Sequence, residues 1–351
     1  MTFRDDLKSI FALREAPGRW RVALQAALSI GIPAVGFALA GQPQLGLLAS
    51  TGSFTALHLA NRSRYERLLW LPFIGAGLII ATTIGAVASA SFAATVIALF
   101  LVAVVASVLC LGWAMGPPGG MFFMLAAGVG ARLAGPVSGG GDALPIGLVV
   151  GMVAIGALVA YLVVAAPLLV PHVRRFNAGL RTDQPRREFG IDPVTRIILI
   201  RIAVASAIGA VAATPLGVHR VYWVLLTIIV ILQNGHQVRF GATRGVQRVL
   251  GTFVGLGVFA LVLLWNPHNL VLALFLMLLQ FTVEMVVVRN YGLALILITP
   301  LALVIATQGT SVNVGQVVGE RVFDTVLGSV IALAVLFASW LVVRARHSAP
   351  L

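Results

Sequence analysis

The sequence predicts an all-α polytopic membrane protein with about twelve transmembrane helices, arranged as two parallel six-helix repeats. Its 351 residues are 60% hydrophobic and only 10% charged, with a mean hydropathy of +1.03, whereas about 25% of residues in soluble domains are charged. Apolar runs of membrane-spanning length fill most of the chain, and the two sides of a central polar linker resemble each other. This composition excludes a disordered chain and a soluble globular enzyme.

Twelve apolar runs are expected to form the helices. They lie at about 22–40, 46–60, 69–89, 93–114, 120–135 and 145–170, and then at about 196–216, 221–234, 246–265, 269–288, 291–308 and 321–343. A full crossing needs about 20 apolar residues, with a range of about 17–25. Most runs qualify, but the second, fifth and eighth are short.

The basic residues predict the orientation of these crossings. With the amino terminus in the cytoplasm, 20 of the 24 Lys and Arg residues fall on cytosolic segments. Only Arg132, Arg220 and Arg321 fall outside, and Arg201 lies inside a span. Such a bias follows the positive-inside rule and supports twelve crossings with both termini cytosolic. The arginines are dispersed over short segments, so we expect no nucleic-acid partner.

The amino-terminal region does not resemble a cleavable signal peptide, because its charged stretch is long and no small-residue cleavage site follows. Residues 3–13 are interpreted either as a short interfacial helix or as a cytosolic tail. Cys110 is the only cysteine, which excludes a disulfide framework and a Cys-rich metal cluster. We expect no metal and no cofactor.

An internal duplication divides the chain into a first repeat at 1–170, a basic cytosolic linker at 171–195 and a second repeat at 196–351. Three alignments pair Arg21 with Arg201, Arg67 with Arg248 and Gly151 with Gly328, at offsets of 180, 181 and 177 residues. Near-constant offsets are what a duplication leaves. Six crossings per half keep the halves in the same orientation, so the repeat axis runs along the membrane normal and a substrate cavity is expected between the halves.

The second half carries a recognisable set of motifs. In order, these are VYWVLLTIIVILQ (221–233), TRGVQRVLGTFVGLGVF (243–259), RNYGLALILITPLAL (289–303) and ERVFDTVLGSVIAL (320–333). This set resembles the fusaric acid resistance (FUSC) family, which is grouped with bacterial aromatic acid exporters. The likeness covers about 195–343, and the first half resembles the family only as a degenerate copy.

The resemblance implies a bacterial inner-membrane exporter of small amphiphilic or aromatic organic acids, driven by the proton gradient. Two alternatives stay open, a passive organic-anion channel and a non-transporting membrane scaffold. Long family members carry a large soluble domain, whereas the linker here has about 25 residues, so no function tied to that domain is expected. The expected partners are the organic anion and the lipid bilayer, and a homo-oligomer is left open.

Ionisable residues inside the spans are the first candidates for function, because charge in the bilayer is costly. Arg201 and Glu284 each lie five residues inside a cytosolic boundary arginine. We expect them to pair, either as a static ion pair or as a site for the substrate anion and for proton coupling; the alternative is that both side chains snorkel to the interface. Asp324, three residues after Arg321, is interpreted as a cap at the start of the twelfth span or as a second proton-coupling carboxylate.

Arginines and aromatic residues supply further candidates for substrate binding. Arg244 and Arg248, with Arg239, Arg62, Arg64 and Arg67, are expected to ring the cytosolic mouth and to attract anions, or to contact lipid headgroups. Trp223, Tyr222 and Tyr291 could stack an aromatic ring, although an interfacial aromatic belt is the alternative for Tyr222 and Trp223.

Short or interrupted spans at matching positions of the two halves point to a binding site. The second span matches the eighth and the fifth matches the eleventh, and backbone groups freed at Gly52, Gly120 and Pro300 could line a cavity. His58 is expected to bond a neighbouring backbone group rather than to shuttle protons. Gly251 and Gly255 are expected to permit close helix packing. No serine triad, Walker motif or metal-ligand cluster is found, so enzyme activity is not expected.

Overall fold

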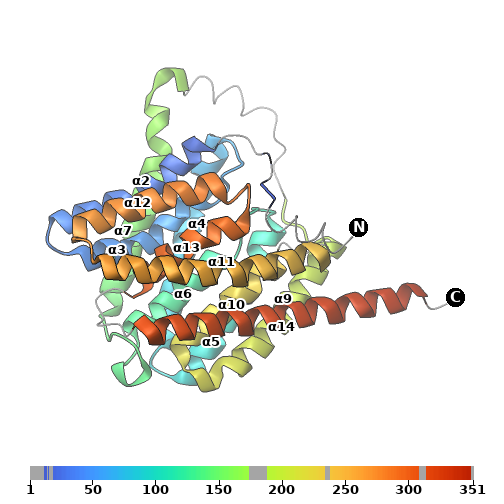
Figure 1. Ribbon diagram of the computed structural model, residues 1–351. Coiled ribbons are helices and arrows are strands. Elements are labelled where there is room, and N and C mark those ends of the chain that lie inside the picture. Colours follow the sequence, from blue (N-terminus) through green and yellow to red (C-terminus); the bar gives the residue numbers. More distant parts are fainter. Residues whose placement is uncertain are drawn as a thin grey trace.

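The computed structural model describes residues 12, 13, 15, 19–173, 188–233, 238–307 and 314–348, and these residues form helices and connecting loops without a strand (Figure 1). The helices of the first half are α2 (Trp20–Leu39), α3 (Pro43–Ser53), η1 (Phe54–Leu57), α4 (Arg64–Ala88), α5 (Phe92–Gly112), α6 (Met121–Ala134), η2 (Val137–Gly139), α7 (Ile146–Ala165) and η3 (Ala166–Leu169). Those of the second half are α9 (Pro193–Ala213), η4 (Thr214–Leu216), α10 (Val218–Leu232), α11 (Val238–Trp265), α12 (Asn269–Val286), α13 (Tyr291–Ala306) and α14 (Val314–Ser348). The predicted all-α class is confirmed. The amino-terminal helix expected at 3–13 lies almost wholly outside the described residues.

Each of the twelve predicted apolar runs contains a helix, but the described helices differ in length. Eight are long and apolar enough to cross a membrane: α2, α4, α5, α7, α9, α11, α12 and α14. The remaining four, α3, α6, α10 and α13, have 11 to 16 residues, below the length of a full crossing. They correspond to the second, fifth, eighth and eleventh runs, respectively. Short helices are therefore present at both predicted pairs of positions, the second with the eighth and the fifth with the eleventh. The count of twelve crossings and the duplication remain predictions.

Capping residues place several helix starts away from the apolar boundaries. Ser63 accepts a hydrogen bond from the backbone of Glu66, so α4 begins at Arg64 and not near residue 69. Asp192 caps α9 ahead of Pro193, before the expected start at 196, whereas Asn290 caps α13 at its expected start, Tyr291. The largest differences are α11, which begins at Val238 instead of residue 246, and α14, which begins at Val314 instead of residue 321. Hydropathy misses such starts because the first turn of a helix is often polar.

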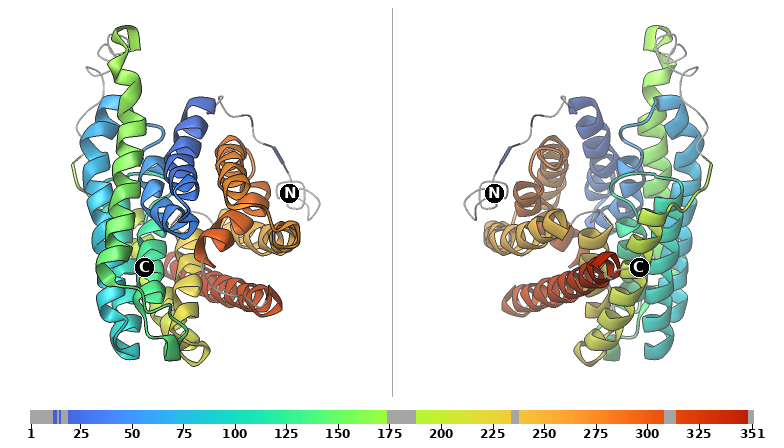
Figure 2. Two further views of the ribbon diagram at one scale, coloured as in Figure 1. Left: turned by 90° about the vertical axis from the view of Figure 1, so that its left-hand side faces the viewer. Right: turned by 90° about the vertical axis from the view of Figure 1, so that its right-hand side faces the viewer.

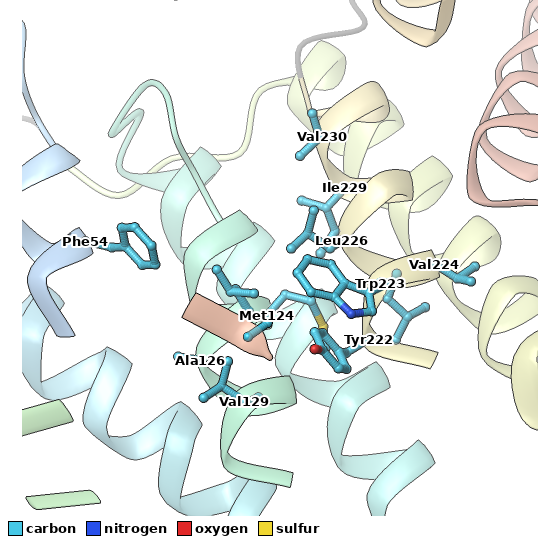
Figure 3. Close-up of a cluster of buried hydrophobic side chains, with 14 of the residues drawn as sticks. Phe54, Met124, Ala126, Val129, Tyr222, Trp223, Val224, Leu226, Ile229 and Val230 are labelled. Atoms are coloured by element: carbon cyan, nitrogen blue, oxygen red, sulfur yellow. The ribbon is translucent and has the colours of Figure 1, made fainter. Parts of the chain in front are cut away.

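The short helices form much of the interior. In α10, every residue from Val221 to Leu232 is buried, as expected of a helix that is apolar on all sides. Figure 3 shows Met124 of α6 beside Tyr222 and Trp223 of α10. Long helices surround this core, and they carry the exposed leucine, isoleucine, valine and phenylalanine side chains that a lipid-facing surface requires.

The packing partners recur in the two halves. In the first, α2 contacts α3 and α7, and α4 contacts α6 and α7; in the second, α9 contacts α10 and α14, and α11 contacts α13 and α14. The halves meet where α2 lies along α12 and where α5 lies along α9 (Figure 1). Figure 2 shows α12 and α13, in orange, on one side of α2, with α4 and α7 on the other.

Glycines allow the closest of these contacts. A side chain at Gly251 would meet the backbone of Gly292, and one at Gly255 would meet Thr299 and the Leu295 carbonyl. The predicted packing role of this pair, between α11 and α13, is confirmed. Gly52 likewise admits the Val153 backbone of α7 against α3, so Gly52 serves helix packing and does not free backbone groups for a cavity.

Candidate functional site: a cavity between the two halves

A cavity of about 610 Å³ lies between the halves. It is lined by residues of η1 and α6 on one side and of α10, α11, α12, α13 and α14 on the other, together with connecting loops. Small-molecule sites typically span about 300–1,000 Å³. The volume therefore suits a small organic molecule.

The cavity reaches the surface at one end. Four of its lining residues are exposed loop residues, namely Asn61, Ala114, Gly116 and Pro117, and we call this end the cavity mouth. Gln233 at the end of α10 donates a hydrogen bond of 2.9 Å to the Pro118 carbonyl, which ties the second half to the loop between α5 and α6 at this end. The loops at the mouth are ones for which the arginine distribution predicts a cytosolic location.

Positive charge dominates the described wall. It carries the arginines Arg19, Arg62, Arg244, Arg248 and Arg321, against one carboxylate, Glu284. Arg248 of α11 is 8% exposed and donates hydrogen bonds to the Tyr291 hydroxyl at 3.0 Å and to Thr227 Oγ1 at 3.4 Å. Its Nε is buried and has no partner. A buried guanidinium whose neighbours are neutral hydroxyls favours an anionic ligand, because burying an unbalanced charge is costly.

Aromatic rings line the same space. Phe54 of η1 and Phe122 of α6 stack with their ring centroids 4.3 Å apart. Arg321 of α14 lies over the indole of Trp223, and Arg244 lies over the ring of Tyr291 at 4.4 Å. These cation–π contacts hold the arginines against the wall. Figure 3 shows Phe54 on a first-half segment and Trp223 on α10.

Five of the seven residues predicted for the site line this cavity: Arg244, Arg248, Trp223, Tyr291 and Glu284. Trp223 and Tyr222 are 8% and 1% exposed, so the alternative of an interfacial belt is wrong for both. Tyr222 packs against Gly128 of α6 instead. A belt residue needs one end in water, and α10 has no exposed face there.

Arg201 lies elsewhere, and the ion pair predicted between it and Glu284 does not form. Glu284 pairs with Arg19 at 3.5 Å. The reason is helix packing, because α12 contacts α2, α3 and α13, whereas α9 contacts α5, α10 and α14. Equal depth along two helices did not mean that the side chains face each other.

Asp324 does not line the cavity either. Its Oδ1 accepts bonds from Arg220 Nη2 at 2.8 Å and from Nε at 3.0 Å, and the carboxylate is 1% exposed. Because α14 begins at Val314, Asp324 lies almost three turns inside the helix, and the predicted cap is wrong. The residue links α14 to α10.

The remaining predicted features divide between packing and the mouth. Arg62 lines the cavity, but Arg67 turns inward and donates to Gln25 Oε1 and to the Ala56 carbonyl. His58 is buried with Nδ1 3.1 Å from the Phe54 carbonyl, as its backbone-bonding interpretation predicted. Gly120 and Pro300 do not line the cavity, and the side chain of Arg239 lies outside the described residues.

Sequence reasoning missed Arg19, Gln280 and the two phenylalanines Phe54 and Phe122. Gln280 is 1% exposed, lines the cavity and has an amide nitrogen without a hydrogen-bond partner. A signal for it was present, since Gln280 lies four residues before Glu284 in an otherwise apolar helix and therefore on the same face. Arg19 gave no such signal, because an arginine just before the first span indicates only that this end of the span faces the cytosol.

Comparison with known proteins supports the resemblance noted in the sequence. Residues 203–335 match the fusaric acid resistance protein-like family. The matched segment covers more than a third of the chain and includes four of the six charged residues on the wall, namely Arg244, Arg248, Glu284 and Arg321. The predicted resemblance is confirmed over these residues.

Curated relatives match a similar share of the chain. The uncharacterized membrane protein YvaC of Bacillus subtilis (strain 168) is 33% identical over 129 residues, which are 36% of this chain and 20% of YvaC. YhfK of Escherichia coli (strain K12) is 32% identical over 135 residues, 38% of this chain and 18% of YhfK. A Synechocystis protein, slr1298, is 30% identical over 142 residues, 40% of this chain and 18% of slr1298. The matches thus span about a fifth of these relatives, and no solved structure matches.

The apolar helices and these relatives together identify the chain as an integral membrane protein. Among the described residues, no group of histidine, cysteine, aspartate and glutamate is arranged to hold a metal ion.

Proposed function

We propose that the protein transports small amphiphilic organic acids, aromatic acids among them, and exports them from the cytosol through the cavity between its halves. The observation that carries this proposal is the wall itself, where one buried guanidinium group, four half-buried ones and several aromatic rings line one space of about 610 Å³. A ligand that satisfies both must combine an anionic group with an apolar ring.

The two sides of the cavity support an oriented substrate. Phe54, Phe122 and Leu125 give the first half an apolar and aromatic surface, whereas Arg248 and Gln280 give the second half polar groups with unpartnered nitrogens. The carboxylate of the substrate would bind the second half, and its ring would pack against the first. Charge-assisted hydrogen bonds to a carboxylate are about twice as strong as neutral ones, which favours the ionised acid.

The position of the mouth supports entry from the cytosol. The lining residues of its connecting loops include Arg62 and no carboxylate, and positive loops mark the cytosolic side of membrane proteins. We therefore place the protein in a bacterial inner membrane with both termini in the cytosol. Arginines near the entrance would raise the local concentration of anions.

Proton coupling is assigned to Glu284, because it is the carboxylate on the described wall. Asp324, paired with Arg220 away from the cavity, is assigned a structural role instead. Protonation of Glu284 would weaken its attraction to Arg19 and shift the balance between conformations.

The test is efflux of labelled aromatic and aliphatic acids from loaded proteoliposomes, with and without an imposed pH gradient. We expect gradient-dependent efflux of aromatic acids that is reduced at least tenfold in Arg248→Gln. Efflux that ignores the gradient, with ohmic anion current, would identify a passive channel. No flux of any acid through folded protein would contradict transport and favour a membrane scaffold.

A further inference from the structure

We propose that Arg19 and Glu284 form a gate at the cavity mouth, and that the carboxylate of the substrate opens it by replacing Glu284 as the partner of Arg19. This inference rests on the proposed function. It adds Arg19 as a substrate-binding residue and assigns Glu284 a role in access.

The pair joins the two halves of the protein. Arg19 directly precedes α2, and Glu284 lies two residues before the end of α12. These helices lie along each other (Figure 1), and both side chains line the cavity. A second contact joins the same two regions, because Asn290, just after α12, donates a hydrogen bond of 3.2 Å to the Ala12 carbonyl. Ala12 and Arg19 thus both contact the segment from the last turn of α12 to the start of α13.

Each partner lies at the unfavourable end of its helix. The amino terminus of a helix carries a partial positive charge and its carboxyl terminus a partial negative charge. Arg19 adds a cation to the start of α2, and Glu284 adds an anion to the last turn of α12. Each side chain therefore depends on the other for compensation, and removing either partner should release the contact.

The contact is also weak enough to exchange. Arg19 Nη2 lies 3.5 Å from Glu284 Oε2, longer than the about 2.7–2.9 Å of a charge-assisted hydrogen bond. Arg19 Nε is buried and has no partner. A substrate carboxylate could accept bonds from two nitrogens of the guanidinium, where Glu284 occupies one at long range.

Glu284 would not be left without compensation after the exchange. Arg67 of α4 acts on it as a second positive charge, and Gln280 lies one turn away on the same face of α12. Gln280, with its unpartnered amide nitrogen, lies on the cavity wall where the incoming anion would bind. If only a fraction of the molecules have an open mouth, the apparent Kd for substrate is the intrinsic Kd divided by that fraction. Weakening the gate raises the fraction and should therefore lower the apparent Kd.

The test measures access to the cavity without assuming transport. Thr252 lines the cavity and is 6% exposed. Cysteine is close to threonine in size, so the thiol of Thr252→Cys reports access to the cavity. The native Cys110 is buried. The rate at which an anionic methanethiosulfonate reagent modifies the introduced thiol is measured in detergent. We expect Glu284→Gln to raise this rate about fivefold, the effect of losing one ion pair. The charge exchange Arg19→Glu with Glu284→Arg should restore the slow rate.

Benzoate that binds in the cavity should slow modification of the cysteine at position 252. This protection tests whether a carboxylate replaces Glu284 as the partner of Arg19. We expect Glu284→Gln to lower the benzoate concentration for half-protection about fivefold, and Arg19→Gln to raise it. Arg21→Gln is the matched control, because Arg21 is exposed at the start of the same helix and lies over Trp20. It should behave as the native protein.

Two results would overturn the proposal, and a third separates its failure from failure of the proposed function. An unchanged modification rate in Glu284→Gln would remove the gate, even if native protein exports acids. Equal benzoate protection in native and Arg19→Gln protein would remove Arg19 as a ligand. Absence of both protection and efflux in the native protein would instead overturn the proposed function, before any variant is compared.

Discussion

Arg248 Nη1 donates a hydrogen bond of 3.0 Å to the hydroxyl of Tyr291, and both residues line the cavity between the halves. Arg248 comes from α11 and Tyr291 from the start of α13. Arg244, one turn before Arg248, covers the ring of the same tyrosine. A single neutral aromatic side chain thus contacts two guanidinium groups on the cavity wall.

Removing the hydroxyl of Tyr291 should weaken anion binding without removing the ring. In Tyr291→Phe, Arg248 loses one of its two described bonds and becomes less well oriented. We expect the apparent KM for aromatic acids to rise about threefold to tenfold, the effect of losing one ordinary hydrogen bond of about 0.5–1.5 kcal/mol. Initial rates of uptake into proteoliposomes measure it.

The control for that variant is Tyr161→Phe on α7, a half-buried tyrosine that does not line the cavity. It should leave the apparent KM unchanged. Equal effects of the two substitutions would show that Tyr291 acts through general packing.

Stacked phenylalanines should select for aromatic substrates. Phe54→Leu and Phe122→Leu keep an apolar wall but remove the ring pair. Because ring stacking contributes about 0.5–1.5 kcal/mol beyond burial, we expect each variant to lose about threefold to tenfold in kcat/KM for benzoate. Transport of an aliphatic acid of similar size should change less.

Phe253→Leu provides the comparison, since Phe253 on α11 is 49% exposed and points away from the cavity wall. Equal losses for aromatic and aliphatic acids in Phe54→Leu would contradict a stacking role. Such a result would make the phenylalanines part of the structural core alone.

The helical architecture could be predicted from the sequence because lipid imposes a strict pattern. Each apolar run contains a helix, and the four short helices α3, α6, α10 and α13 lie at the predicted positions. The starts of several longer helices were misplaced, as at Arg64 of α4, because polar residues belong to first turns that hydropathy omits. Capping side chains such as Ser63 decide those ends.

The site could be predicted only in part, because a sequence gives depth along a helix but not the direction a side chain faces. Arg248 and Tyr291 were found as polar residues in apolar surroundings. Arg201 met the same criterion, yet α9 places it outside the cavity wall. The partner of Glu284 depended on α2 lying along α12, a contact between distant segments that no local pattern specifies.

The ion pair between Arg220 and Asp324 should contribute to stability rather than to transport. Asp324→Asn leaves the Arg220 guanidinium, 14% exposed, without its carboxylate. Breaking a buried pair costs about 3–5 kcal/mol, so we expect a clear fall in the melting temperature in detergent. Transport at low temperature, and its dependence on the pH gradient, should persist.

The double variant Arg220→Gln with Asp324→Asn checks this assignment. It should be less destabilised than the two single losses added together, because no unpaired charge remains. A stable Asp324→Asn protein that transports without regard to the gradient would return Asp324 to the proton-coupling role.

Close packing of α11 on α13 should make Gly255 far less tolerant than its neighbour Gly257. A methyl group at Gly255 would meet the Thr299 side chain and approach the Leu295 carbonyl, whereas nothing lies within 4 Å of one at Gly257. Overpacking costs about 1–3 kcal/mol, so Gly255→Ala should lower the melting temperature. Gly257→Ala should match or exceed native stability, because alanine favours a helix by about 1 kcal/mol over glycine. Since Thr299 also lines the cavity, Gly255→Ala should impair transport as well, and equal stability of the two variants would contradict the close contact on which this wall of the cavity depends.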